Sequence, residues 1–148
     1  MPRRGPGIVR NAESNLVFVD SSAWIALFSR RDQHHAEADR MFRAAVASKS
    51  RLLSTNLVLA EIHRLFLFRA GSRAAAAVLE TIEASPLVKI EFAGLSHHSA
   101  AKNWMEKLSD YTISYTDAVS FAVMKSTRCL QVMTFDHHYR LAGFDVVA

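Results

Sequence analysis

A short apolar run that ends in an aspartate constrains the fold of this chain more than any other feature. Residues 16–19, Leu-Val-Phe-Val, are uninterrupted by polar residues, which is the pattern of a strand buried on both faces of a parallel sheet. Asp20 follows at once, and Ser21 and Ser22 are expected to cap a helix that continues from Ala23. Asp20 would then stand at the carboxyl end of a strand, where open α/β sheets bind ligands.

The rest of the chain alternates between strand-like and helix-like segments. Further strands are predicted at residues 52–54, 87–90, 130–134 and 144–147, and helices at 23–28, 34–47, 57–67, 73–84, 96–108 and 114–124, with a short helical turn after residue 136. Strands separated by helices predict an α/β fold with a central parallel sheet flanked by helices on both faces.

Several residues are expected to mark where these helices begin and end. Thr55 or Asn56, Ser96 and Ser114 are placed to cap the helices that follow them, because their side chains accept hydrogen bonds from free backbone N–H groups. Gly71 is expected to end one helix before the next begins.

Length and composition indicate one domain. The chain has 148 residues, and residues 16–148 are enough for a single core. Residues 1–15 hold two of the three prolines and lack the apolar centre of a secretion signal, so we interpret them as a flexible basic arm. No apolar run approaches the roughly 18 residues that span a bilayer. The single cysteine, Cys129, excludes an intrachain disulfide framework, and a cytoplasmic location is expected.

Four acidic residues stand where solvated surface charges are not expected. Asp20 and Asp136 each follow an apolar strand, and Glu61 and Asp117 lie on the apolar sides of predicted helices. The carboxyl ends of parallel strands share one edge of the sheet, so all four side chains are predicted to converge there.

Such a cluster of like charges needs compensation, because unpaired buried carboxylates are strongly disfavoured. One alternative is a buried salt bridge, with Arg64 or Arg140 as the partner. The other is a divalent cation, and oxygen ligands without cysteine favour Mg²⁺ or Mn²⁺. Two such ions can activate water for attack on a phosphodiester. The histidine pairs 34–35, 97–98 and 137–138 do not predict zinc, since neighbouring helical residues point about 100° apart.

The acids lie within short motifs that occur in a particular order. These are Val17-Phe18-Val19-Asp20-Ser21-Ser22, Glu61 on a helix, Tyr115-Thr116-Asp117-Ala118, and Thr134-Phe135-Asp136-His137-His138-Tyr139. In this order the chain resembles the PIN-domain nucleases, and among them the VapC-like toxins of toxin–antitoxin pairs, from about Leu16 to Ala148. Tyr139 stands where many relatives have phenylalanine.

This resemblance implies a Mg²⁺- or Mn²⁺-dependent endoribonuclease with strand order 3-2-1-4-5. It implies that Asp20, Glu61, Asp117 and Asp136 form the catalytic metal site, with Ser22 and Thr116 as assisting residues. It also implies a homodimer and inhibition by an antitoxin protein that lies across the active-site groove.

The partners suggested by the residues themselves are less specific. The net charge of +4 suits an anionic partner such as RNA, although charge alone supports only weak attraction. Arg30, Arg31 and Arg64 are candidates for phosphate contacts. Leu65 and Phe66 belong to an apolar stripe that is mostly core, of which a part could receive an antitoxin helix.

Other function classes remain open at this point. A PIN-domain RNA-processing or RNA-binding protein that is not a toxin would carry the same acids, and a non-catalytic interaction module would keep the fold without turnover. An aspartyl-phosphate phosphatase also begins with a strand and an aspartate. It needs a second acid two residues later, where this chain has Ser22.

Overall fold

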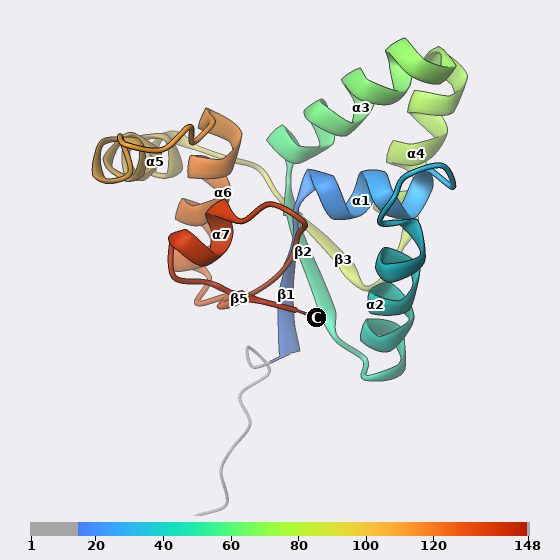
Figure 1. Ribbon diagram of the computed structural model, residues 1–148, viewed down its shortest axis with the longest axis horizontal. Coiled ribbons are helices and arrows are strands. Elements are labelled where there is room, and N and C mark those ends of the chain that lie inside the picture. The colour runs from blue at the N-terminus through green and yellow to red at the C-terminus, as the bar shows by residue number, and fades with distance from the viewer. Residues whose placement is uncertain (1–14, 148) are drawn as a thin grey trace, which may run out of the picture.

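A five-stranded parallel sheet forms the centre of the computed structural model, which describes residues 15–147. Its order is β3-β2-β1-β4-β5, as predicted (Figure 1). The strands are β1 (Leu16–Val19), β2 (Arg51–Thr55), β3 (Val88–Glu91), β4 (Gln131–Met133) and β5 (Asp145–Val146). The basic arm predicted for residues 1–15 lies outside the described residues, apart from Asn15.

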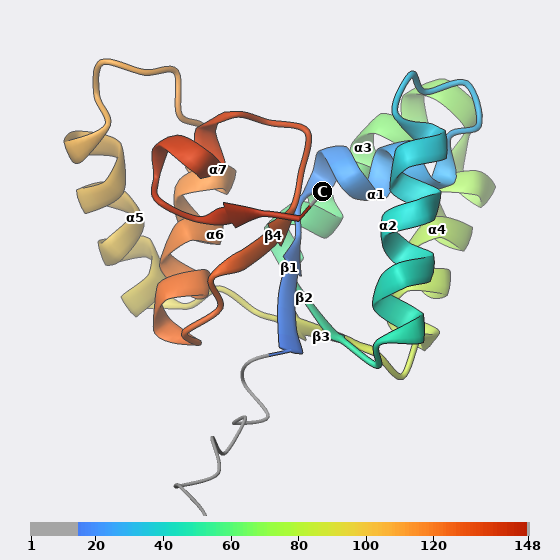
Figure 2. The same cartoon turned by 60° about the horizontal axis from the view of Figure 1, so that its bottom comes forward.

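Seven helices in the described part of the chain cover the two faces of this sheet. Figures 1 and 2 show that they form two groups, one on each side of the sheet. The first group is α1 (Ser21–Phe28), α2 (His35–Ala47), α3 (Asn56–Ala70) and α4 (Ser72–Ala84), and the second is α5 (Leu95–Lys107), α6 (Tyr115–Ser126) and α7 (His138–Leu141). The α/β prediction with helices on both faces is therefore confirmed.

The strand register determines which residues meet at the carboxyl edge. Val19, the last residue of β1, is paired with Met133, the last residue of β4. The Asp20 N–H then donates to the Met133 carbonyl at 3.1 Å. Asp20 and Thr134 consequently leave the sheet side by side, although 114 positions separate them in the chain.

Aromatic side chains fill the core between the sheet and the second group of helices. The Phe121 ring is fully buried and lies edge-on to Tyr139, with centroids 5.0 Å apart and an interplanar angle of 86°. Phe121 also packs against Trp104 and Phe144, with ring centroids 5.4 and 5.6 Å apart respectively. These contacts tie α5, α6, α7 and the segment before β5 into one unit.

Two of the predicted helix caps are confirmed. The Thr55 hydroxyl accepts from the Val58 N–H at 3.1 Å, and the Ser114 hydroxyl accepts from the Asp117 N–H at the same distance. Gly71 separates α3 from α4 with φ at +92°, a conformation that costs glycine little.

Two other cap predictions are wrong. Helix α5 begins at Leu95 rather than after Ser96, and His97 Nδ1 accepts from the Gly94 N–H at 3.1 Å. Ser21 and Ser22 do not cap α1, because they lie inside its first turn and Asp20 is the N-cap residue. Their hydroxyls donate to the Asp20 carboxylate instead. A charged acceptor makes the stronger hydrogen bond.

Between residues 15 and 147, the structure contains no helix of the length and apolar character that a membrane crossing requires.

The aromatic core gives a stability prediction. Phe121→Ala removes a fully buried ring that contacts three other aromatic rings. It should therefore lower the free energy of unfolding by about 3–5 kcal/mol. Phe92→Ala is the matched control, since Phe92 is 70% exposed and its loss should cost no more than about 0.5 kcal/mol. Urea denaturation followed by circular dichroism measures both, and equal losses would contradict this description of the core.

Candidate active site

The Asp20 carboxylate lies at the centre of the site and is almost fully buried, with 2% exposed. The Tyr139 hydroxyl donates to its Oδ1 atom at 3.0 Å. The hydroxyls of Thr134 and Ser22 donate to Oδ2 at 2.9 and 3.0 Å. Burial raises the pKa of this carboxyl above its usual value, and hydrogen bonds from Thr134, Ser22 and Tyr139 oppose that rise.

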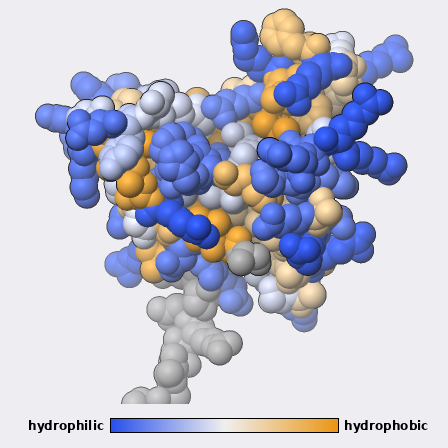
Figure 3. Space-filling view, in the orientation of Figure 1, coloured by the Kyte–Doolittle hydropathy of each residue, from blue (hydrophilic) through white to orange (hydrophobic). Residues whose placement is uncertain are grey.

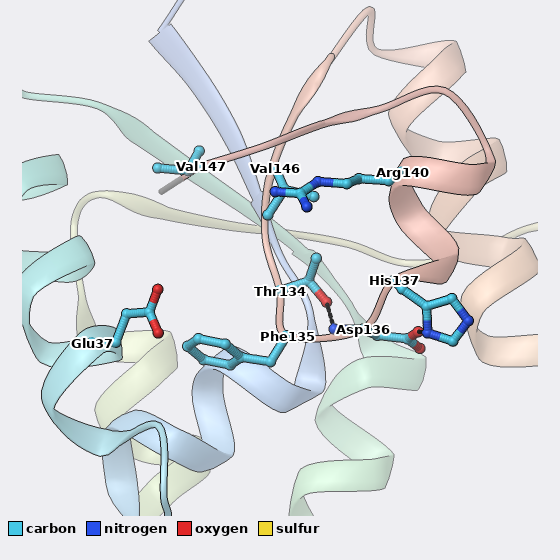
Figure 4. Close-up of a pocket in the computed structure, with 8 residues that line it drawn as sticks. All are labelled: Glu37, Thr134, Phe135, Asp136, His137, Arg140, Val146 and Val147. Atoms are coloured by element: carbon cyan, nitrogen blue, oxygen red, sulfur yellow. Dashed lines mark hydrogen bonds and ion pairs between the residues drawn. The ribbon is translucent and has the colours of Figure 1, made fainter.

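Two of these hydroxyls connect Asp20 to the loop that carries Asp136. The Ser22 hydroxyl accepts from the Phe135 N–H, and the Thr134 hydroxyl accepts from the Asp136 N–H, both at 3.0 Å. Figure 4 shows the second of these bonds. Each hydroxyl thus accepts a hydrogen bond from a backbone N–H group and donates one to Asp20. The position of the loop is therefore coupled to that of the buried carboxylate.

Asp136 is partly buried and lies immediately before α7. Its Oδ1 atom accepts from the His138 N–H at 2.9 Å, which orders the turn into that helix. His138 Nδ1 is also 3.1 Å from this oxygen. That nitrogen is buried and makes no hydrogen bond, so we interpret the contact as close but poorly aligned for donation.

Glu61 reaches the site from α3, in the second turn after the Thr55 cap. It is partly buried, and burial raises the pKa of its carboxyl. The charge of Asp20 adds to that rise, while hydrogen bonds from Ser21 and Thr116 act against it. The contribution from Asp20 indicates that these carboxylates lie near each other.

Asp117 lies in the first turn of α6. Its pKa is raised to about 7, first by burial and then by the negative charges of Asp20 and Asp136, with a smaller contribution from Glu61. Coupling to all three other acids requires them to be close in space. The four sequence-predicted carboxylates therefore lie near enough to one another, at the carboxyl edge of the sheet, for their charges to interact.

No arginine or lysine in the part of the chain that the structure describes lies within 4 Å of these four carboxylates. The cation–carboxylate pairs found there are Arg43–Asp39 and Lys89–Glu91, and histidines alone flank Asp136. Neither Arg64 nor Arg140 forms the buried salt bridge considered from the sequence. The donor set is instead rich in carboxylate oxygens, which fits Mg²⁺ or Mn²⁺.

The histidines differ in part from expectation. One ligand atom from each of Asp136, His137 and His138 lies within 4.8 Å of the others, so this group could hold a metal ion. The two rings lie 4.3 Å apart at their centroids. They lie close together although His137, the N-cap residue of α7, has helical backbone angles. The prediction that neighbouring histidines diverge is wrong for this pair.

The other two histidine pairs do diverge. His34 stacks on Phe135 with ring centroids 4.2 Å apart, whereas His35 Nδ1 bonds to the Ala26 carbonyl at 2.7 Å. His97 bonds to a backbone N–H, and His98 Nδ1 bonds to the Tyr115 hydroxyl at 2.9 Å.

A cavity of about 260 Å³ opens beside the loop that carries Asp136 (Figure 4). Side chains from α2, α7 and the last strand complete its lining, which is Glu37, Thr134, Phe135, Asp136, His137, Arg140, Val146 and Val147. The carboxyl edge of the sheet is therefore open to solvent beside Asp136.

A second hollow lies on α3 and is lined almost entirely by apolar surface. Glu61, Arg64, Leu65, Phe68 and Arg69 surround it, and the Arg64 guanidinium lies 5.1 Å from the centroid of the Phe68 ring. Phe68 is 73% exposed. The apolar stripe predicted on this helix is thus mostly core, but its outer part reaches the surface next to a site carboxylate.

The remaining predicted site residues fall into two groups. Ser22 donates a hydrogen bond to Asp20, and Thr116 lies close enough to Glu61 to lower the pKa of its carboxyl. Arg30 and Arg31 are exposed in the connection between α1 and α2. Their segment leads to His34, which packs on Phe135 in the loop before Asp136.

Two residues that contact the central carboxylate were not assigned a role from the sequence. Thr134 lies within a motif and Tyr139 was noted only as a departure from phenylalanine. The sequence did contain a signal for both residues, because a hydroxyl that is buried with an apolar segment needs a hydrogen-bond partner. The partner could not be identified without the strand register.

Comparisons with known proteins identify the family and the relatives of this chain. The PIN domain family matches residues 17–145. The protein described as 23S rRNA-specific endonuclease VapC20, from two strains of Mycobacterium tuberculosis, is 35% identical over 130 residues, which are 87% of this chain and 95% of that protein. The crystal structure of M. tuberculosis VapC20, described as a Sarcin-Ricin loop cleaving toxin, superimposes with a TM-score of 0.77 at 32% identity. That match covers 86% of this chain and 95% of the other.

The raised pKa of Asp117 predicts an unusual pH dependence for the metal-free protein. The folded protein holds the Asp117 proton up to about pH 7, whereas the unfolded chain releases it near 3.8. The folded state therefore binds more protons between these values, and the free energy of unfolding must fall as pH rises through them. Relative to Asp117→Asn, the wild type should lose about 1–3 kcal/mol from pH 4 to pH 7.

Urea unfolding in EDTA at several pH values measures this difference. A buried salt bridge predicts the reverse, because Asp117→Asn would then be the less stable protein at pH 7.

Proposed function

The chain belongs to the PIN-domain family, and on that premise we propose that it is a metal-dependent endoribonuclease of the VapC type, a hydrolase of RNA phosphodiester bonds. The observation that carries this proposal is the gathering of four carboxylates without a lysine or arginine partner among the described residues. Perturbed pKa values at one edge of a sheet are typical of functional sites.

Asp20, Glu61, Asp117 and Asp136 would hold Mg²⁺ or Mn²⁺. When bound, such ions lower the pKa of a water molecule and stabilise the charge that develops on the phosphodiester. The protein supplies carboxylates whose positions are set in advance. Asp20 is held by three hydroxyls at 2.9–3.0 Å. Thr116 lies close enough to Glu61 to lower the pKa of its carboxyl, and we propose that it helps to orient this second acid.

The substrate that we propose is structured RNA. VapC20 is described as specific for 23S rRNA and as cleaving the sarcin–ricin loop, so this hairpin is the first RNA to test. Arg30, Arg31 and Arg64 are exposed, and we propose that they contact phosphates of the bound RNA. The net charge of +4 favours the approach of RNA. Activity on such a substrate would place the protein in the cytoplasm.

The partner that we propose is an antitoxin whose apolar segment occupies the hollow on α3. Figure 3 shows hydrophobic side chains over α3 and α4 with hydrophilic ones around them. The arginines beside Phe68 would suit acidic residues flanking that segment. We also propose a homodimer, and light scattering at micromolar concentration tests it, since a monomer there would contradict it.

The central prediction concerns cleavage and metal. The wild-type protein should cut a sarcin–ricin loop hairpin in the presence of Mg²⁺ or Mn²⁺, and EDTA should abolish this cleavage. Asp20→Asn should reduce cleavage at least about 10²-fold because it removes a charged ligand from the site. Gel analysis of labelled RNA measures both. The matched control is Glu83→Gln, an acid-to-amide change at an exposed position on α4, which should leave cleavage unchanged.

Metal-indifferent cleavage, or equal cleavage by wild type and Asp20→Asn, would remove the proposed mechanism. No cleavage of any RNA by a folded, metal-bound protein would instead favour the non-catalytic interaction module.

The antitoxin proposal predicts that a substitution in the hollow on α3 weakens inhibition by the antitoxin without abolishing RNA cleavage. Phe68→Asp places a charge in the apolar hollow, so it should weaken inhibition by a co-purified antitoxin at least about tenfold while RNA cleavage persists. Phe92→Asp changes an equally exposed ring on a different segment and serves as the control. A titration of cleavage against antitoxin concentration measures this effect. Cleavage without growth arrest on expression would indicate a PIN ribonuclease that is not a toxin.

A further inference from the structure

We propose that Tyr139 is a positioning residue of the metal site, whose hydroxyl holds Asp20 in the orientation that binds the ion. This inference rests on the proposed function, since it concerns the same carboxylate. It assigns a role to a side chain that lies in the core, behind the carboxylate, and that the sequence motifs do not mark as a ligand.

The first observation is the geometry of the contact. The Tyr139 hydroxyl lies 3.0 Å from Asp20 Oδ1, and both side chains are buried, with 0% and 2% exposed. The closest other side-chain donor to Oδ1 in the described chain is the Ser21 hydroxyl, at 3.4 Å. Tyr139 therefore makes the main hydrogen bond to that oxygen.

The second observation is that the core fixes the ring. Phe121 lies edge-on to it at 5.0 Å and Phe18 packs against it with centroids 6.4 Å apart. A ring held by neighbours on β1 and α6 places its hydroxyl at a defined point, so the contact depends on core packing and not on a mobile side chain.

The third observation is the direction of the hydrogen bond. The Tyr139 hydroxyl is the donor and Asp20 Oδ1 is the acceptor in this buried contact. An ionised carboxylate only accepts hydrogen bonds. Tyr139 consequently donates, and it satisfies one carboxylate oxygen while Ser22 and Thr134 satisfy the other.

These contacts hold the carboxylate from two sides. Oδ2 is held from α1 and the end of β4, and Oδ1 is held from α7. A carboxylate held at both oxygens cannot rotate freely about its own axis. Residues that hold a metal ligand in this way typically account for a 10–100-fold change in metal affinity. The phenyl ring alone would fill the core, so the hydroxyl can be removed separately.

The test is Tyr139→Phe, with Mn²⁺ binding measured directly by titration calorimetry or by the spectrum of free Mn²⁺, without RNA. We expect binding at least about tenfold weaker than in the wild type, with little change in the urea unfolding midpoint in EDTA. Tyr111→Phe is the matched control. It removes the same atom from a side chain that is 49% exposed, and it should bind Mn²⁺ as the wild type does.

Each outcome decides the matter. Equal or tighter Mn²⁺ binding by Tyr139→Phe would overturn the inference, and so would a loss of stability in EDTA with unchanged binding, because that is the signature of a purely structural tyrosine. A wild type that binds no Mn²⁺ would overturn the proposed function itself. All measurements are made at 4 °C on protein whose folding has been verified by circular dichroism, so unfolding of the variant is not mistaken for weak binding.

Discussion

The burial of one carboxylate is the constraint on which the rest of the site depends. Asp20 is 2% exposed, and a charge in that position is tolerated only if other groups solvate it. Hydroxyls from α1, the end of β4 and α7 do so. Since Ser22 and Thr134 also accept from the backbone of the following loop, solvating Asp20 and placing Asp136 are one structural event.

The other two acids are positioned by the first turns of two helices. Glu61 and Asp117 lie near the beginnings of α3 and α6, whose first turns are fixed by the Thr55 and Ser114 caps at the end of β2 and before α6. A helix that starts at the carboxyl edge of a parallel sheet directs its first turns over that edge. The helix caps therefore set the positions of Glu61 and Asp117, although their negative charges repel each other and those of the other two acids.

That repulsion distinguishes this site from the rest of the fold. The pKa values of Asp20, Glu61 and Asp117 are all raised by burial, and mutual charge adds to the rise for Glu61 and Asp117. Stability alone would favour replacing such a cluster by apolar or neutral residues. Proteins keep local conflicts of this kind mainly where function requires them, and the divalent cation that we propose for this site would relieve the conflict.

The sequence by itself determined the α/β class, the strand order through its family resemblance, and the four acids, because hydrophobic periodicity and misplaced charges are local properties that can be read along the chain. Only the tertiary structure decided that Ser21 and Ser22 turn to Asp20 instead of capping α1, that His137 and His138 lie together, and that Arg64 and Arg140 leave the acids unpaired. It also decided that Thr134 and Tyr139 meet Asp20. These contacts join residues more than 110 positions apart, and they depend on the register of β1 with β4 and on the packing of one aromatic ring, which no local pattern specifies.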